Sequence, residues 1–138
     1  MFALITLLST LSVECPATID TEQQILTAPS GWQAMVRDPA GQPTRQTTHY
    51  LDGLTLFDGE PGELASLKPD NGDADDTPQA PHRWSGLQSA RLYLVCHYRG
   101  TAATLQQPLP AHLTSCTVSH KDKDEILGLR CQPGPHKP

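Results

Sequence analysis

Apolar and polar residues alternate over several short stretches of the chain, the pattern that is typical of half-buried β-strands. In the clearest stretch, residues 90–98, alternate side chains are assigned to opposite faces of one strand: Leu92, Leu94, Cys96 and Tyr98 on one, and Tyr93, Val95 and His97 on the other. Further strands are predicted over residues 49–57, 82–87, 102–110, 113–120 and 126–131. Residues 32–37 are predicted to form a short strand with Trp32 and Met35 packed inward.

The links between these strands are short, which predicts an antiparallel meander of four strands in the C-terminal half. Pro108 and Pro110 are expected to end their strand or to place it at an edge. Helical spacing of apolar residues is confined to residues 62–69, a candidate for one short helix ended by Pro69. We therefore predict a mainly β, or β-rich α+β, fold: a small antiparallel meander or sandwich with at most one short helix.

Composition supports a single small domain that is rich in turns. The chain has 138 residues, of which 37% are hydrophobic, and contains 13 Pro and 10 Gly. The net charge of −5 is concentrated in residues 57–76, where seven carboxylates face a single base, Lys68. The remaining sequence has no basic stripe that could neutralise phosphates, so we expect no nucleic-acid partner.

The N-terminal segment resembles an export signal. Residues 2–13 are apolar over the length of a signal core and are too short to span a bilayer, and cleavage is expected just after Ser12. No Lys or Arg precedes this run, so a truncated or mis-assigned start, or a buried N-terminal strand or helix, remains an alternative. We predict a signal segment over 1–13, one β-rich domain over 14–131, a disordered tail over 132–138, and no integral membrane association of the mature protein.

The four cysteines support export, because an even number without a C-x-x-C pair favours two disulfides in an oxidising compartment. Of three possible connectivities, one is favoured by local geometry. A hairpin turn centred near Lys123 and Asp124 places Cys116 opposite Cys131, within disulfide reach. Cys15 and Cys96 then form the second pair.

Several kinds of site were weighed in the sequence. The stretch "DNGDADD" (70–76) has the composition of a calcium loop but not the EF-hand spacing. Asp58, Glu60 and Glu63 could supply a pair of catalytic carboxylates, yet few aromatic residues are available to wall a cleft. His97 and His120 lie on predicted strands and could converge on a transition metal, although no H-E-x-x-H motif is present.

A catalytic nucleophile is also hard to place. No G-x-S-x-G motif is present, and paired cysteines leave no thiol for catalysis. The sequence thus predicts a protein that is not an enzyme and uses no cofactor. Trp84 is expected to anchor the core of a small sandwich, with a role in surface recognition as the alternative.

A longer pattern runs through most of the chain. In order, it comprises "CPATI" (15–19), "GW" (31–32), "LTLFDGEPGELASLKPD" (54–70), "RW" (83–84), "LYLVCHYRGTAATLQQPLP" (92–110), "SC" (115–116) and "LRC" (129–131). This succession resembles a family of small exported proteobacterial proteins without an assigned function. The resemblance implies export and two disulfides, and it implies that residues 57–70 form a shared block, whereas "NGDADD" is a variable loop.

These observations favour a non-enzymatic binding module of the bacterial periplasm, or a secreted one. We predict an inhibitor or immunity-type protein whose acidic surface engages a cationic protein partner. The candidate interaction surface consists of Asp58, Glu60, Glu63, Asp70 and Trp84. The alternatives are an exported calcium- or transition-metal-binding protein and an unrecognised enzyme that uses carboxylates near Asp58.

Overall fold

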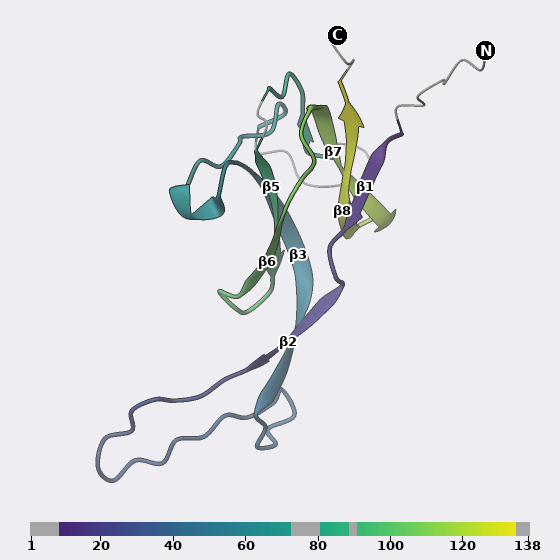
Figure 1. The fold of residues 1–138 in the computed structure, drawn as a ribbon. Helices are drawn as coiled ribbons and strands as arrows, with labels where there is room; N and C mark the ends of the chain where they lie inside the picture. Colours follow the sequence, from purple (N-terminus) through teal and green to yellow (C-terminus); the bar gives the residue numbers. More distant parts are fainter. Residues whose placement is uncertain (1–8, 73–80, 89–90, 135–138) are drawn as a thin grey trace, which may run out of the picture.

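The computed structural model describes residues 9–72, 81–88 and 91–134, which form two four-stranded antiparallel sheets (Figure 1). The first sheet has the order β1-β8-β7-β4, with bounds Leu11–Glu14, Glu125–Pro133, Leu113–Asp122 and Arg83–Trp84. The second has the order β2-β3-β5-β6, with bounds Thr18–Glu22, Gln46–Asp58, Leu92–Tyr98 and Thr104–Pro108. The predicted β-rich antiparallel fold is confirmed. Within the described ranges, no helix has the length and apolar character needed to span a bilayer.

One hydrophobic core lies between the two sheets. The second sheet contributes Leu54 and Leu56 from β3 and every second residue of β5. These β5 residues are the four that the sequence places on one face of the strand, and the structure shows that this face points inward. The first sheet contributes Trp84, Cys116, Val118, Leu129 and Cys131. Because both sheets bury one face against the same core, the molecule is a sandwich.

The four C-terminal strands do not form one meander. β5 pairs with β6 in the second sheet, whereas β7 pairs with β8 in the first. The connection from β6 to β7 therefore crosses from the second sheet to the first. Alternation of side chains marks a strand but carries no information on which sheet the strand joins, so the local pattern could not show this division. Pro108 ends β6, which is an edge strand.

Two disulfides join the pairs that the sequence favours. Cys116 and Cys131 are direct partners on β7 and β8, with a Cα–Cα distance of 4.0 Å, and the turn between the strands is centred on Lys123 and Asp124. Cys15, which follows β1, is bonded to Cys96 on β5. The first disulfide therefore lies within one sheet, while the second ties the crossing from β1 to β2 to the other sheet.

The predicted helix over residues 62–69 is wrong. Only Pro61–Glu63 form a 3-10 turn, and Leu64 follows with a φ of 62° in the left-handed region. The chain then returns along β3, where Asp58 N donates to Ala65 O and Leu67 N donates to Leu56 O. Burial of Leu67 against the core and these hydrogen bonds to β3 outweigh a weak helical preference that Pro61 and Pro69 limit to two turns.

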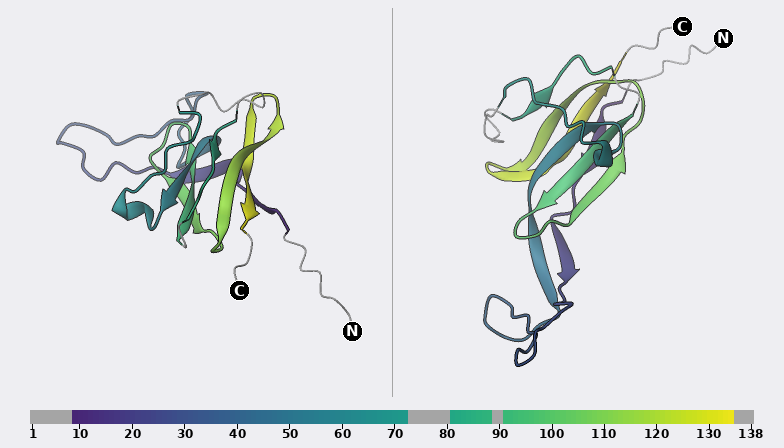
Figure 2. Two further views of the ribbon diagram at one scale, coloured as in Figure 1. Left: turned by 90° about the horizontal axis from the view of Figure 1, so that it is seen from above. Right: turned by 90° about the vertical axis from the view of Figure 1, so that its left-hand side faces the viewer.

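The predicted strand over residues 32–37 is also wrong. Residues 23–45 leave the end of the β2–β3 ribbon as a long loop that projects away from both sheets (Figures 1 and 2). Trp32 is 75% exposed and Met35 is 49% exposed, so neither packs inward. We call residues 23–45 the arm.

The ends of the chain differ in part from the predicted boundaries. Leu11–Glu14, which overlap the end of the predicted signal segment, form β1 and pair with β8. β8 continues through Pro133, so the first residues of the predicted tail belong to the first sheet. The remainder of the signal segment (1–8), the end of the tail (135–138) and three of the predicted acidic residues (Asp73, Asp75 and Asp76) lie outside the described residues.

Candidate functional site

The carboxylate-rich segment of residues 57–70, which we call the acidic block, begins at the end of β3 and is hydrogen-bonded to β4. Gly59 has a φ of 91°, which glycine adopts readily, and it turns the chain after Asp58. Asp70 N donates to Arg83 O over 2.7 Å, and Ser85 Oγ donates to the carboxylate of Asp70. These bonds hold the returning segment against the sandwich while Glu60 and Glu63 stay exposed.

Only part of the predicted interaction surface comes together. Asp58 and Asp70 both line a shallow pocket of about 240 Å³, beside Lys68 and Ser85, whereas Glu60 and Glu63 do not line it. Trp84 is only 3% exposed, and its Nε1 donates to Leu67 O over 3.0 Å. Its inclusion in the interaction surface was therefore wrong, because burial and this hydrogen bond make it a core anchor. It forms one wall of the pocket and positions Leu67.

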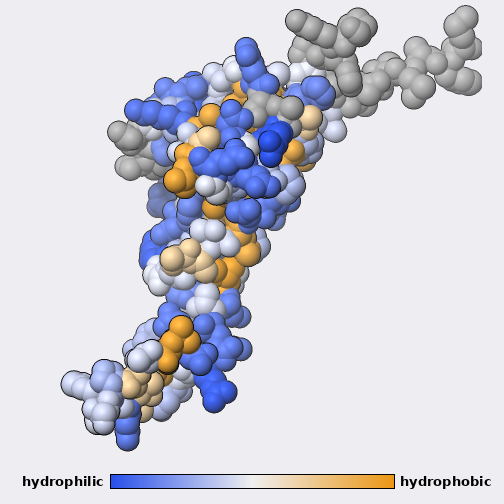
Figure 3. Space-filling view, turned by 60° about the vertical axis from the view of Figure 1, so that its left-hand side comes forward, coloured by the Kyte–Doolittle hydropathy of each residue, from blue (hydrophilic) through white to orange (hydrophobic). Residues whose placement is uncertain are grey.

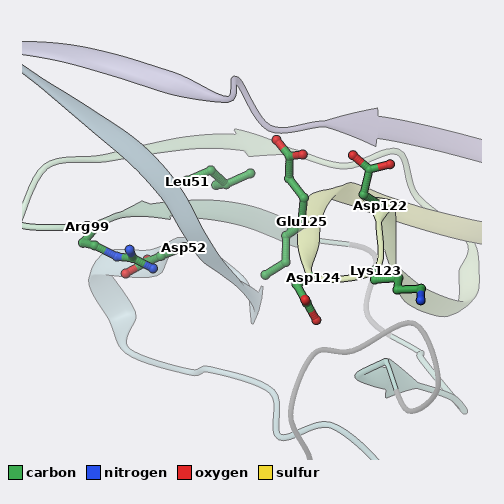
Figure 4. Close-up of a pocket in the computed structure, with 8 residues that line it drawn as sticks. Leu51, Asp52, Arg99, Asp122, Lys123, Asp124 and Glu125 are labelled. Atoms are coloured by element: carbon green, nitrogen blue, oxygen red, sulfur yellow. The ribbon is translucent and has the colours of Figure 1, made fainter.

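A second acidic surface was missed in the sequence. An open pocket of about 410 Å³ lies between β3 and the β7–β8 turn, and Leu51 and Ile126 contribute its apolar part. Its charged lining residues are shown in Figure 4: Asp52, Arg99, Asp122, Lys123, Asp124 and Glu125. The sequence predicted the turn itself, but not that Asp52 of β3 lines the same pocket, because the two lie some seventy residues apart in the chain.

Two carboxylates of this pocket belong to residues that lie directly opposite each other on neighbouring strands. Asp122 and Glu125 are direct partners across the β7–β8 hairpin, and Figure 4 shows both carboxylates pointing to the same side, whereas Lys123 and Asp124 point to the other. Like charges directly opposite each other destabilise a hairpin. A cationic group placed against this pair would remove that repulsion.

The described residues offer little support for a metal site. No group of three or more His, Cys, Asp or Glu side chains among them lies close enough to hold a metal ion. His97 belongs to β5 in the second sheet and His120 to β7 in the first, and the Nε2 of His97 lies 2.7 Å from the Thr55 hydroxyl. His49 is buried, with its Nδ1 donating to Arg99 O and its Nε2 lying 2.8 Å from the Thr21 hydroxyl.

The arm forms a third surface, on which exposed apolar side chains lie among polar ones. Seven large hydrophobic side chains of the described residues are exposed, and four of these are Ile25, Leu26, Trp32 and Met35. In Figure 3 the projection carries orange and pale orange residues among pale and blue ones. No local pattern could reveal that these side chains lack a sheet to pack against.

Comparisons with known proteins agree with an interaction protein. The family model for the type VI secretion system Tli immunity protein matches residues 44–132, which extend from the end of the arm into β8. An uncharacterized 16.3 kDa protein in the trpG 5′ region of Azospirillum brasilense is 28% identical over 117 residues, covering 79% of this chain and 71% of that protein. No solved structure matches the chain.

Proposed function

The chain belongs to the Tli immunity protein family of type VI secretion systems, and we propose that it protects its cell in the periplasm by binding a toxin. The observation that carries this proposal is the match to the immunity family over residues 44–132, a region that includes β3 through most of β8. The family supports the predicted inhibitor or immunity-type role and the prediction that the protein is not an enzyme. Neutralisation would then occur through contact, without a reaction.

The periplasmic location is supported by the cysteines. All four are joined in disulfides, which persist in oxidising compartments and are rare in the cytosol. If residues 1–13 act in export, the pairing of β1 with β8 favours cleavage before Leu11, because cleavage after Ser12 would remove half of that strand. We therefore place the start of the mature protein at or before Leu11.

The proposed partner has a basic surface. Glu60 and Glu63 are exposed near Asp58 and Asp70, and Asp122 and Glu125 form a second group of carboxylates beside Asp52. Carboxylates on the rim of an interface increase the rate at which a cationic partner associates and help to exclude partners of the same charge. The Trp84 ring does not take part, since it is buried.

A protection assay tests this proposal. The type VI effector encoded beside this gene is targeted to the periplasm of a sensitive strain, with the full-length immunity gene or an empty vector in the same cell. We expect growth only with the immunity gene, and a saturable complex when the two purified proteins are titrated. A matched gene in which residues 1–10 are replaced by an initiating Met should express the protein without export and fail to protect. Absence of both protection and a complex would contradict the proposal.

A further inference from the structure

Backbone hydrogen bonds close two turns within the arm between β2 and β3. Its outer turn is closed by a hydrogen bond from Trp32 N to Pro29 O, with Gly31 at a φ of 90°. On the returning leg, Asp38 N donates to Gln42 O, and Thr44 N donates to Val36 O. The carboxylate of Asp38 accepts from Gln42 N over 2.8 Å. The two turns are thus fixed within the arm, which projects from the body (Figure 1).

Four large apolar side chains of the arm are exposed, among exposed polar residues such as Gln24 and Gln33. Leu26 is 87% exposed and Trp32 is 75% exposed, and Ile25 and Met35 line an open groove between the two legs. Exposed apolar side chains gathered in one place mark interaction sites, whereas single ones need no explanation. Trp is also the residue type most enriched among those that dominate binding energy.

The arm carries almost no charge, in contrast to the body. The outer part of the arm, residues 23–36, has no charged residue; Arg37 and Asp38 on the returning leg have opposite charges, and Arg45 lies at the base of the arm. Arg37 and Asp38 also make hydrogen bonds inside the arm: Arg37 Nη1 donates to Gly41 O, and Asp38 Oδ1 accepts from Gln42 N. The complementary surface is therefore uncharged and apolar, and it is recessed, since the arm is a projection.

We propose that the tip of the arm inserts Leu26 and Trp32 into an uncharged apolar recess of the toxin, an inference that rests on the proposed function. The arm would supply the desolvated anchor of the complex, while the carboxylates of the body contact the basic rim. The family match begins at residue 44 and leaves almost the whole arm outside. Because the arm projects outside the region that the family model matches, we expect it to serve the recognition of one particular toxin.

Affinity measurements with the purified effector encoded beside this gene test the proposal. Leu26→Ser and Trp32→Ser in the full-length protein are each expected to weaken Kd by about 30-fold or more. The matched controls Leu105→Ser and Tyr50→Ser remove exposed apolar side chains from β6 and β3, and should change Kd by less than about threefold. The thermal midpoints of the two arm variants should equal that of the wild type, because these side chains are exposed.

The outcomes separate this inference from the proposed function. If the wild type binds the effector and both arm variants bind equally well, the inference fails while the function stands. If the wild type does not bind, both fail. A Trp32-dependent dimer in sedimentation velocity, or Trp32-dependent binding to phosphatidylglycerol vesicles, with unchanged affinity for the effector, would assign the arm to a second copy or a membrane and overturn the inference.

Discussion

The hydroxyl group of Tyr98 donates a 2.7 Å hydrogen bond to the carbonyl oxygen of Pro16, beside the disulfide that joins Cys15 to Cys96. Two adjacent residues of the crossing from β1 to β2 are therefore attached to β5, once by a covalent bond and once by a hydrogen bond. Because β1 and β2 belong to different sheets, this attachment fixes the point where the chain passes from one sheet to the other.

Tyr98 should make the free energy of unfolding depend on pH in the alkaline range. Burial raises the pKa of its hydroxyl group above the ordinary value of 10.0. Its contribution to stability is therefore complete below about pH 10 and is lost as pH rises from there through the folded-state pKa, because the unfolded state releases the proton first. Tyr98→Phe should lower the free energy of unfolding by about 1 kcal/mol at pH 7 through loss of the hydrogen bond.

Urea unfolding between pH 7 and pH 11 measures this effect. The gap between wild type and Tyr98→Phe should narrow above about pH 10, since the variant has no proton to lose at that site. Tyr50→Phe is the matched control, because Tyr50 is exposed on β3. An alkaline slope in Tyr98→Phe equal to that of the wild type would show that the buried phenol is not its cause.

The two disulfides should differ in their contributions to stability. In the chain-entropy model a closed loop of 15 residues contributes about 3 kcal/mol and a loop of 81 residues about 4.5 kcal/mol. The pair of substitutions Cys15→Ala and Cys96→Ala should therefore destabilise the domain more than Cys116→Ala with Cys131→Ala. Denaturant unfolding at 10 °C checks the order, and the reverse order would show that the crossing is held mainly by other contacts.

The sequence was most informative where the relevant contacts are local. Cys116 and Cys131 flank one turn, so alternation of side chains and turn composition were enough to place them opposite each other. The same reasoning failed at Trp32, because inward packing of a strand requires a surface beneath it, which local sequence does not specify. It also failed for the acidic pocket, since Asp52 and the β7–β8 turn line one pocket only because β3 lies against β8.

Gly128 should be intolerant of any side chain if β1 belongs to the mature protein. A Cβ at this position would lie 2.0 Å from Val13 O and 2.8 Å from Glu14 Cα, so β1 would have to move away from β8. Gly128→Ala should destabilise the domain by about 1–3 kcal/mol, the range for overpacked sites. Gly62→Ala, where nothing lies within 4 Å of the added Cβ, is the matched control.

Chemical denaturation of the exported protein and sequencing of its N-terminus test this prediction together. We expect the mature chain to start at or before Leu11 and to lose stability on Gly128→Ala. A mature chain that begins at Val13, with Gly128→Ala as stable as Gly62→Ala, would show that cleavage follows Ser12 and that β1 is not part of the functional fold.

Removal of carboxylates should slow association with a basic toxin. Asp122→Asn with Glu125→Gln removes the matched pair of the β7–β8 turn, and Glu60→Gln with Glu63→Gln removes two exposed carboxylates of the acidic block. Each pair of substitutions should lower the association rate by about three- to tenfold at 50 mM salt and reduce its dependence on salt, with little change in the dissociation rate. The first pair should also stabilise the free protein by a few tenths of a kcal/mol, because it relieves like-charge repulsion across the hairpin.

Stopped-flow mixing with the effector at 50 and 300 mM NaCl measures these rates. Glu14→Gln with Glu22→Gln changes the net charge equally, at exposed positions on β1 and β2. If all three double variants slow association to the same extent, net charge alone is responsible and neither acidic surface contacts the partner. If the rates are unaffected by salt in the wild type as well, the partner surface is not cationic, and binding depends on the apolar arm without electrostatic steering.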